Sequence, residues 1–304
     1  MPVAVAIGAD PALIIAAATP APENVSEYAF AGALRGARSA VAPALTVPLF
    51  VPAAAEIVLE GWIEPGETAP EGPYGDHTGY YNAVDRFPVL RLTAMTHRDA
   101  PVYLSTFTGR APDEPSVLAT ALLDVFLPLL RQSFPELVDC WMPPEACSYR
   151  IAILSVRKAY PGHARRLMMG LWSLLPQFAM TKMIVVVDDD IDARNWSDVL
   201  WAMATRMDPG RDLLVIADTP MDPLDFASPQ PALAGKLGID ATIKIGPETT
   251  RDWGRPLAMP REVVDRMQHR FGHLFAEPDD IQADRPHAER RLAANENTGH
   301  AVRQ

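Results

Sequence analysis

The stretch EGPYGDHTGYY, residues 71–81, has the composition of a loop that could donate a proton. It contains two carboxylates, Glu71 and Asp76, together with three glycines, a proline and His77. The Gly-Pro pair excludes a helix, and the glycines allow tight turns or a close approach to a ligand. When two carboxylates converge, one of them keeps its proton near neutral pH, as a general acid must. The alternative is a solvated turn with ordinary acids.

Three further places in the sequence could carry chemistry. Glu27 lies in SEYAFAG, in the first turn of an expected helix, where a carboxylate complements the helix dipole or binds a metal ion. The acids of DDDID, residues 188–192, follow an apolar strand and fit either a ligand site at a strand end or caps of the next helix. Lys182, just before that strand, could reach solvent or point inward. We expect His77 to be a structural hydrogen bonder.

Several classes of function are disfavoured by the sequence. It lacks a G-x-S-x-G elbow, an H-E-x-x-H pair, a Walker A loop and a G-x-G-x-x-G fingerprint, so nucleotide hydrolysis and dinucleotide binding are unsupported. A net charge of −11 argues against binding nucleic acid, which needs clustered Lys and Arg. The apolar start has neither the basic flank of a signal peptide nor the length of a membrane span. We therefore expect a cytoplasmic protein with reduced thiols at Cys140 and Cys147.

The elements needed to position these residues differ between the two parts of the chain. The first part is expected to be rich in β-strands. Its expected elements are a strand over 2–8, a helix from Asp10-Pro11, a helix over 26–36 capped by Ser26 and ended by Gly36, a strand IVLEGWI that turns at Pro65-Gly66, and a hairpin with strands near 89–97 and 102–108.

From about residue 113 the pattern changes to alternating helices and strands, which predicts a layered α/β domain. The unbroken apolar run IVVV is typical of a strand that is buried on both faces. The expected elements are a helix capped by Ser116, strand YRIAILSVR, helix HARRLMMGLWSLL, strand KMIVVVDDDID, helix WSDVLWAMATRM and strand DLLVIAD.

Taken in order, these stretches resemble the UbiD family of decarboxylases, which includes ferulic acid decarboxylases. The resemblance is greatest to the branch that acts on 4-hydroxy-3-polyprenylbenzoate in ubiquinone biosynthesis. The matching stretches cover nearly residues 2–258 and are GADPA, SEYAFAGALRG, AEIVLEGWIEPGETAPEGPYGDHTGYYN, TGRAPDEPSVL, FPELVDCWMPPEACSYR, GHARRLMMGLWS, TKMIVVVDDDIDARNW, TRMDPGRD, DFASP and KLGIDATIK.

The resemblance implies a non-oxidative decarboxylation that uses prenylated FMN, a divalent metal such as Mn²⁺, and K⁺. It implies that Glu27 binds the metal and cofactor, that Asp76 donates the proton, and that Glu71 belongs to the ionic network of Asp76. Lys182 is a further candidate for facing the cofactor. The implied partners are a small aromatic acid and a flavin prenyltransferase that supplies the cofactor. Homo-oligomers and a peripheral membrane association through a lipidic substrate are also implied.

The expected fold class is α/β (α+β), with a partial split β-barrel of the flavin-reductase type followed by a layered α/β domain. We expect residues 1–112 to be the second half of the barrel domain, 113–275 the C-terminal domain and 276–304 a polar tail. Compared with the family pattern, an N-terminal section is expected to be lacking. Two alternatives are therefore left open. The first is a truncated non-catalytic remnant that acts as an oligomerisation or interaction module. The second is a metal-dependent hydrolase built on Glu27, Asp76 and the acids of 188–192.

Overall fold

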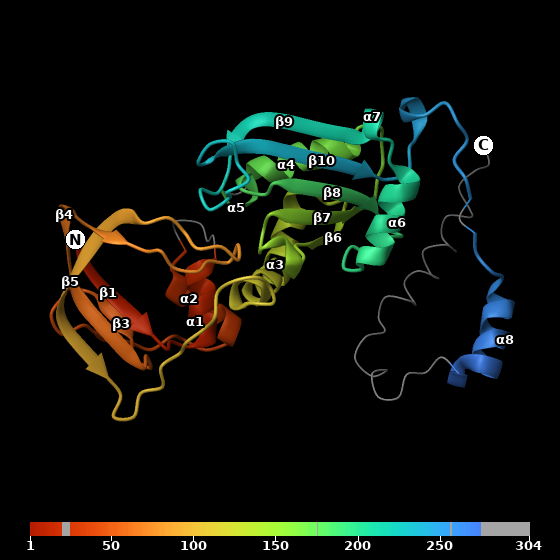
Figure 1. The fold of residues 1–304 in the computed structure, drawn as a ribbon. Helices are drawn as coiled ribbons and strands as arrows, with labels where there is room; N and C mark the ends of the chain where they lie inside the picture. The colour runs from red at the N-terminus through yellow and green to blue at the C-terminus, as the bar shows by residue number, and fades with distance from the viewer. Residues whose placement is uncertain (20–24, 175, 256, 275–304) are drawn as a thin grey trace.

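The computed structural model describes residues 1–19, 25–174, 176–255 and 257–274, and the tail expected over 276–304 lies outside this part. The described residues form two sheet-based halves, which are joined by the chain that leads into helix α3 (Figure 1). The expected mixed α/β class is confirmed.

The N-terminal half contains an antiparallel sheet in the order β1-β4-β5 and a two-stranded ribbon of β2 and β3. Within the described residues this sheet is open, with β1 at one edge, and no closed barrel forms. The elements are β1 (Pro2–Ile7), α1 (Pro11–Ala18), α2 (Glu27–Arg35), β2 (Val41–Pro43), β3 (Phe50–Pro52), β4 (Ile57–Glu71) and β5 (Asp85–His97).

Local signals set the ends of the first two helices. Asp10 caps α1 by accepting the Ala12 N–H at 2.9 Å, and a proline follows the cap, as expected. Gly36 ends α2 in the left-handed conformation with φ of +70°, which glycine adopts without steric cost. Ser26 occupies the N-cap position of α2, but its side chain makes no capping hydrogen bond. Ser26 was therefore correctly predicted as the N-cap residue, but the prediction that its side chain caps the helix was wrong.

The expected turn at Pro65-Gly66 was wrong, because β4 continues through it to Glu71. The register along β5 shifts between Ile63 and Thr68, so the residues between them bulge out of the ladder, with φ of +81° at Gly66. Beyond this bulge, β4 continues to Glu71, the first residue of the acid-bearing stretch.

The expected hairpin of strands near 89–97 and 102–108 was also wrong in its second strand. Residues 101–107 have no regular secondary structure, and β5 pairs with β4 instead. Pro101 has no N–H for a ladder, and the Val102 N–H donates to the Glu56 carboxylate at 3.1 Å. The chain is thus held to the start of β4 rather than to β5.

The C-terminal half is a layered α/β unit around a five-stranded mixed sheet in the order β6-β7-β8-β10-β9. Strands β7, β8 and β10 are parallel, and the two outer strands are antiparallel to their neighbours. The elements are α3 (Glu114–Ser133), β6 (Leu137–Trp141), η1 (Pro144–Ala146), β7 (Ile151–Val156), α4 (His163–Leu174), α5 (Pro176–Ala179), β8 (Met183–Asp188), α6 (Trp196–Arg206), α7 (Pro209–Asp212), β9 (Leu213–Pro220), β10 (Leu233–Ala241), η2 (Gly246–Glu248), α8 (Arg261–Phe271) and η3 (Gly272–Leu274).

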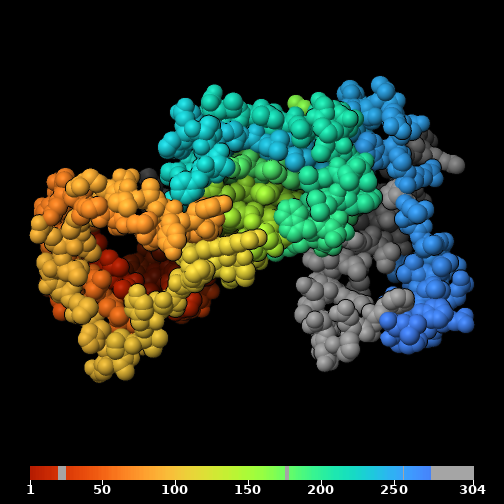
Figure 2. Space-filling view, viewed as in Figure 1, coloured from red at the N-terminus to blue at the C-terminus, as the bar shows by residue number. Residues whose placement is uncertain are grey.

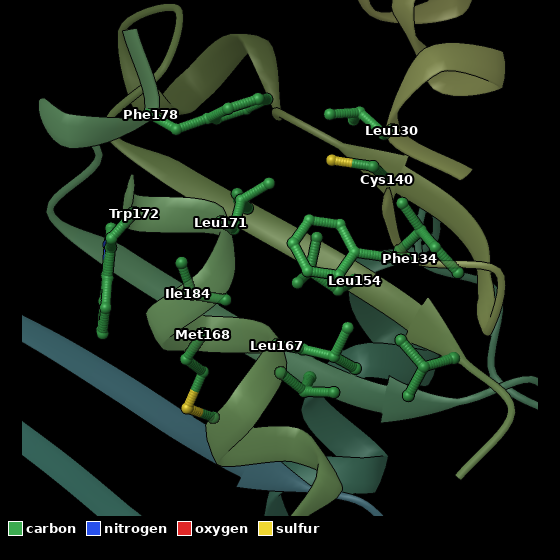
Figure 3. Close-up of a cluster of buried hydrophobic side chains, with 14 of the residues drawn as sticks. Leu130, Phe134, Cys140, Leu154, Leu167, Met168, Leu171, Trp172, Phe178 and Ile184 are labelled. Atoms are coloured by element: carbon green, nitrogen blue, oxygen red, sulfur yellow. The ribbon is translucent and has the colours of Figure 1, made fainter. Parts of the chain in front are cut away.

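Strand β8 is buried on both faces, as the IVVV run predicts. Ile184 and Val186 pack in a cluster with side chains from α3 and α4, part of which is shown in Figure 3. Val185 and Val187 belong to a second cluster on the opposite face, which includes side chains of α6. The central strands therefore lie between two helical layers.

Helix α3 begins about one turn earlier than expected. Asp113, rather than Ser116, is the N-cap, and the two residues form a capping box in which each side chain bonds the backbone of the other. By length and composition this helix is apolar enough to span a membrane, but Leu123 and Leu130 are buried in the core of the C-terminal half. Only 22% of its most apolar window is buried within the described structure.

Candidate active site

The stretch that carries Asp76 forms a tight loop between β4 and β5. Gly75 and Tyr81 make an antiparallel bridge, and the Asp76 N–H donates to the Tyr80 carbonyl at 3.2 Å. At the tip, the Gly79 N–H donates to the Asp76 carbonyl at 2.8 Å, with φ of +80° at Gly79. A residue with a Cβ rarely adopts this conformation. The expected role of glycine in closing the loop is therefore confirmed at this position.

Inside this loop, Asp76 is paired with its neighbour His77. The Asp76 Oδ1 atom accepts the His77 N–H at 2.7 Å and lies 2.7 Å from the ring atom Nδ1. His77 is thus a hydrogen bonder, as expected. Glu71 lies at the exposed end of β4, opposite Asp85 in the register. Within the described residues, no hydrogen bond or ion pair joins Glu71 to Asp76.

The loop reaches across to the C-terminal half of the molecule (Figure 1). The His77 Nε2 atom lies 3.7 Å from an oxygen of Asp222, in the segment between β9 and β10. The Tyr80 ring packs edge-on against Phe226 of the same segment, with 6.1 Å between the ring centroids. The candidate acid Asp76 therefore lies where the two halves meet.

A chain of ion pairs continues from this contact to Lys182. Arg150 donates to Asp222 at 2.9 Å and lies 3.3 Å from Asp225, which in turn is 2.5 Å from Lys182 Nζ. Burial acts to raise the pKa of Asp225, but Lys182 and Arg150 outweigh it and the pKa is lowered. Lys182, whose side chain is 34% exposed, thus pairs with a buried carboxylate next to the residues that face the acid loop.

An apolar cavity of about 280 Å³ lies beside this network. Its polar lining residues include His77 and Tyr149, and helix α3 provides an apolar wall that includes Leu118 and Leu122. Burial, and then the hydrogen bond to Asp222, raise the pKa of Tyr149 far above its usual value, so its hydroxyl stays a donor. Such a cavity suits an apolar or aromatic ligand with few polar groups.

Glu27 lies on the wall of a separate cavity of about 480 Å³ between β1, α1, α2 and β3. Four alanines contribute to this wall. Figure 2 shows that the N-terminal half is hollowed on one face and that its first residues, coloured red, lie deep in this hollow. Burial and the neighbouring Glu27 carboxylate raise the pKa of Tyr28. Helix α1 borders both cavities, since Ala17 lines this one and Ala18 the apolar one.

The acids of DDDID are mostly engaged within the protein. Arg206 bonds both Asp188 and Asp190 at 2.6 Å, and the Ile243 N–H donates to Asp188 at 2.7 Å. Burial raises the pKa of Asp188 although Arg206 opposes this effect. The structure thus supports a role in stability for these acids and separates them from Asp76.

The described residues supply only part of a metal site. A hard divalent cation needs several oxygen or nitrogen ligands. No group of three or more His, Cys, Asp or Glu side chains placed to hold a metal occurs in the described ranges. The Glu27 carboxylate fits the role of one ligand, and the cavity beside it has room for a phosphate-bearing cofactor, but a complete metal site does not form from these residues alone.

Two domain descriptions match the chain. Residues 1–111 match the 3-octaprenyl-4-hydroxybenzoate carboxy-lyase Rift-related domain, called UbiD, and residues 116–241 match the C-terminal domain of the same carboxy-lyase. The chain belongs to the UbiD family. The expected family is therefore confirmed on two domains that together cover most of the chain.

Solved structures of UbiD-class enzymes are similar to this chain. The UbiD-class enzyme HmfF from Pelotomaculum thermopropionicum, in complex with FMN, is 33% identical with a TM-score of 0.71, over 84% of this chain and 57% of its own. Vanillic acid decarboxylase from Sedimentibacter hydroxybenzoicus, in its closed form, is 29% identical with a TM-score of 0.82, over 91% and 58%. This UbiD chain thus spans less than two thirds of their length. The open form of the latter enzyme gives a TM-score of 0.73.

Sequence reasoning missed four residues of the candidate site of this UbiD chain, namely Tyr149, Arg150, Asp222 and Asp225. Weak signals existed, because SYR and DFASP both lie in the stretches that resemble the family. A buried arginine is rare unless it is paired, so the arginine that directly precedes an apolar strand was the clearest local signal. Its partners are distant in the sequence, and only the fold brings them together.

Proposed function

We propose that this chain carries out the non-oxidative decarboxylation of an aromatic or unsaturated acid, with Asp76 as the proton donor. The observation that supports this proposal is the Asp76–His77 pair, with 2.7 Å between Oδ1 and Nδ1, next to an apolar cavity between the two halves. Loss of CO₂ leaves an electron pair on carbon, and the vacated position must then receive one proton. A carboxyl group next to an apolar cavity can supply it.

The cofactor of the proposed reaction is prenylated FMN. One related UbiD-class structure contains FMN and another contains prFMN. When bound, this cofactor supplies the electron sink that no side chain provides. We propose that Glu27 contributes one ligand to a divalent cation that holds the cofactor phosphate, and that Lys182 and Glu71 lie toward the cofactor and the acid.

The proposed substrate is 4-hydroxy-3-polyprenylbenzoate. The name of the matching carboxy-lyase domains and the apolar wall of α3 support a substrate with an isoprenoid chain. The vanillic acid decarboxylase relative indicates the alternative of a small aromatic acid without that chain. A homo-oligomer, a flavin prenyltransferase as supplier of the cofactor, and contact with a membrane through the isoprenoid chain complete the proposal.

The test is to produce the 304-residue chain together with a flavin prenyltransferase and to measure its absorption spectrum and CO₂ release from both acids. We expect a bound flavin and decarboxylation, and we expect Asp76→Asn to lower kcat about 100-fold or more without loss of the flavin. Asp99→Asn is the matched control, since Asp99 is an exposed acid outside the site. A folded but colourless protein would contradict the proposal and favour an interaction module.

A further inference from the structure

The carboxylate of Asp222 is held in one orientation from three sides. Its Oδ2 atom accepts the Tyr149 hydroxyl at 2.8 Å and an Arg150 N–H at 2.9 Å, and its Oδ1 atom accepts the Leu224 N–H at 2.8 Å. Asp222 is only 5% exposed. Three hydrogen-bond donors from different directions fix the orientation of a buried carboxylate. None of these contacts is needed by the proposed reaction itself.

The same carboxylate faces the histidine that bonds the candidate acid. The His77 Nε2 atom lies 3.7 Å from Asp222 Oδ2, while the other ring nitrogen lies 2.7 Å from Asp76. The His77 side chain is 13% exposed, and its Nε2 atom is buried without a hydrogen-bond partner among the described residues. His77 thus stands between two carboxylates, one on each half of the molecule. The 3.7 Å contact is too long for a hydrogen bond and acts through charge.

A carboxylate next to one ring nitrogen of a neutral histidine favours the tautomer with the proton on that nitrogen. We propose that Asp222 is a positioning residue whose charge favours the Nε2–H tautomer of His77 and so opposes the Nδ1–H tautomer that the Asp76 carboxylate, 2.7 Å from Nδ1, favours. In the Nε2–H tautomer, Nδ1 can accept a hydrogen bond from Asp76 in the proton-donating form that the reaction needs. This inference rests on the proposed function of Asp76. In each turnover Asp76 passes one proton to carbon and regains one from water, while His77 and Asp222 keep their protonation states.

The rest of the network serves to fix Asp222. Arg150 also lies near Asp225, which Lys182 contacts, so the guanidinium cannot swing away from Asp222 without breaking a second ion pair. The Tyr149 ring, whose hydroxyl bonds Asp222, packs tilted beside the His77 ring with 5.9 Å between the ring centroids. The network therefore fixes the position of the Asp222 carboxylate that faces His77.

The test is a long-range ¹H–¹⁵N NMR spectrum of the histidine rings in the full chain, which needs neither cofactor nor substrate. His77→Gln identifies the His77 signals among those of the seven histidines. We expect Asp222→Asn, which keeps the shape but loses the charge, to shift the tautomer equilibrium of the His77 ring toward the Nδ1–H form relative to the wild-type protein. Asp189→Asn is the matched control, because it removes one charge at a partly exposed acid far along the chain from His77.

A folded Asp222→Asn protein with the wild-type tautomer would overturn the inference. If that variant does not fold, Tyr149→Phe removes one of the three bonds to Asp222 and must shift the tautomer in the same direction by a smaller amount. No shift in Tyr149→Phe would then overturn it. In an active preparation, Asp222→Asn should lower kcat about tenfold with little change in KM. A chain that shows the tautomer shift but no decarboxylation would refute the proposed function alone.

Discussion

At the scale of single residues, the N-terminal sheet contains a buried carboxylate that no ion pair neutralises in the described structure. Glu60 is 1% exposed, and it accepts the N–H groups of Leu45 and Thr46 at 2.9 and 2.6 Å and the Thr46 hydroxyl at 2.9 Å. These N–H donors lower the pKa of Glu60. The carboxylate thereby ties the segment after β2 to the first residues of β4.

The two cysteines differ at the same scale. Burial raises the pKa of Cys140 to about 12, whereas Cys147 is only half-buried. Because the thiolate is the reactive form, iodoacetamide at pH 8 should modify Cys147 and leave Cys140 unmodified. Peptide mass spectrometry of the folded protein measures this, and Cys147→Ser should take up no label. Labelling of Cys140 in the folded protein would contradict the burial seen here.

At the scale of elements, the connection from β7 to α4 is anchored to the end of β10 by a buried lysine. Lys158 Nζ donates to Glu248 at 2.6 Å, to the Thr242 hydroxyl at 2.9 Å and to the Ile243 carbonyl at 3.0 Å. Its side chain is 3% exposed. Every donor of this ammonium is used, so the contact orders the segment that follows β10.

Removing this lysine should destabilise the C-terminal half. Lys158→Met leaves Glu248 without its buried cation, and we expect the free energy of unfolding to fall by about 3–5 kcal/mol. Urea denaturation followed by circular dichroism measures the change. Arg157→Met, at the preceding residue, is the control: Arg157 is 71% exposed and 3.5 Å from Asp189, so its loss should cost about 0.5 kcal/mol or less. Equal losses in both variants would contradict the anchoring role.

At the scale of the whole molecule, buried carboxylates in ion pairs make the stability depend on pH. Burial acts to raise the pKa of both Asp225 and Glu248, but the lysines that they contact outweigh it and lower both values. Asp188 is the opposite case, because burial raises its pKa. The folded protein thus binds fewer protons at Asp225 and Glu248 than the unfolded chain does in mildly acidic solution.

The free energy of unfolding should therefore be constant near neutral pH and fall as the pH drops below about 4, through the lowered pKa values of the folded state. Urea titrations at a series of pH values measure this dependence. In Glu248→Gln the neutral-pH stability should be lower and the loss on acidification smaller, because one of the carboxyl groups with a lowered pKa no longer titrates. A wild-type stability that increases on acidification would show that Asp188 dominates instead.

Much of the C-terminal half could be predicted from local sequence. The alternation of apolar residues located α4, β7, β8 and α6, and the IVVV run correctly indicated burial on both faces of β8. Caps such as Asp10 and Gly36 were also predictable, because each acts on backbone groups within a few residues. The expected strand over 102–108 failed since β-pairing depends on a partner, and Glu56 holds that backbone instead.

By itself, the sequence determined the family and the residues of the acid-bearing loop, because the motifs around Glu27, Glu71 and Asp76 are contiguous stretches of chain. Only the tertiary structure placed Asp222 against His77 and separated the 188–192 acids from Asp76. Tyr149 and Asp222, for example, are 73 residues apart and share a hydrogen bond of 2.8 Å. Such contacts depend on how the sheet order and the two halves pack, and no local spacing of residues encodes that arrangement.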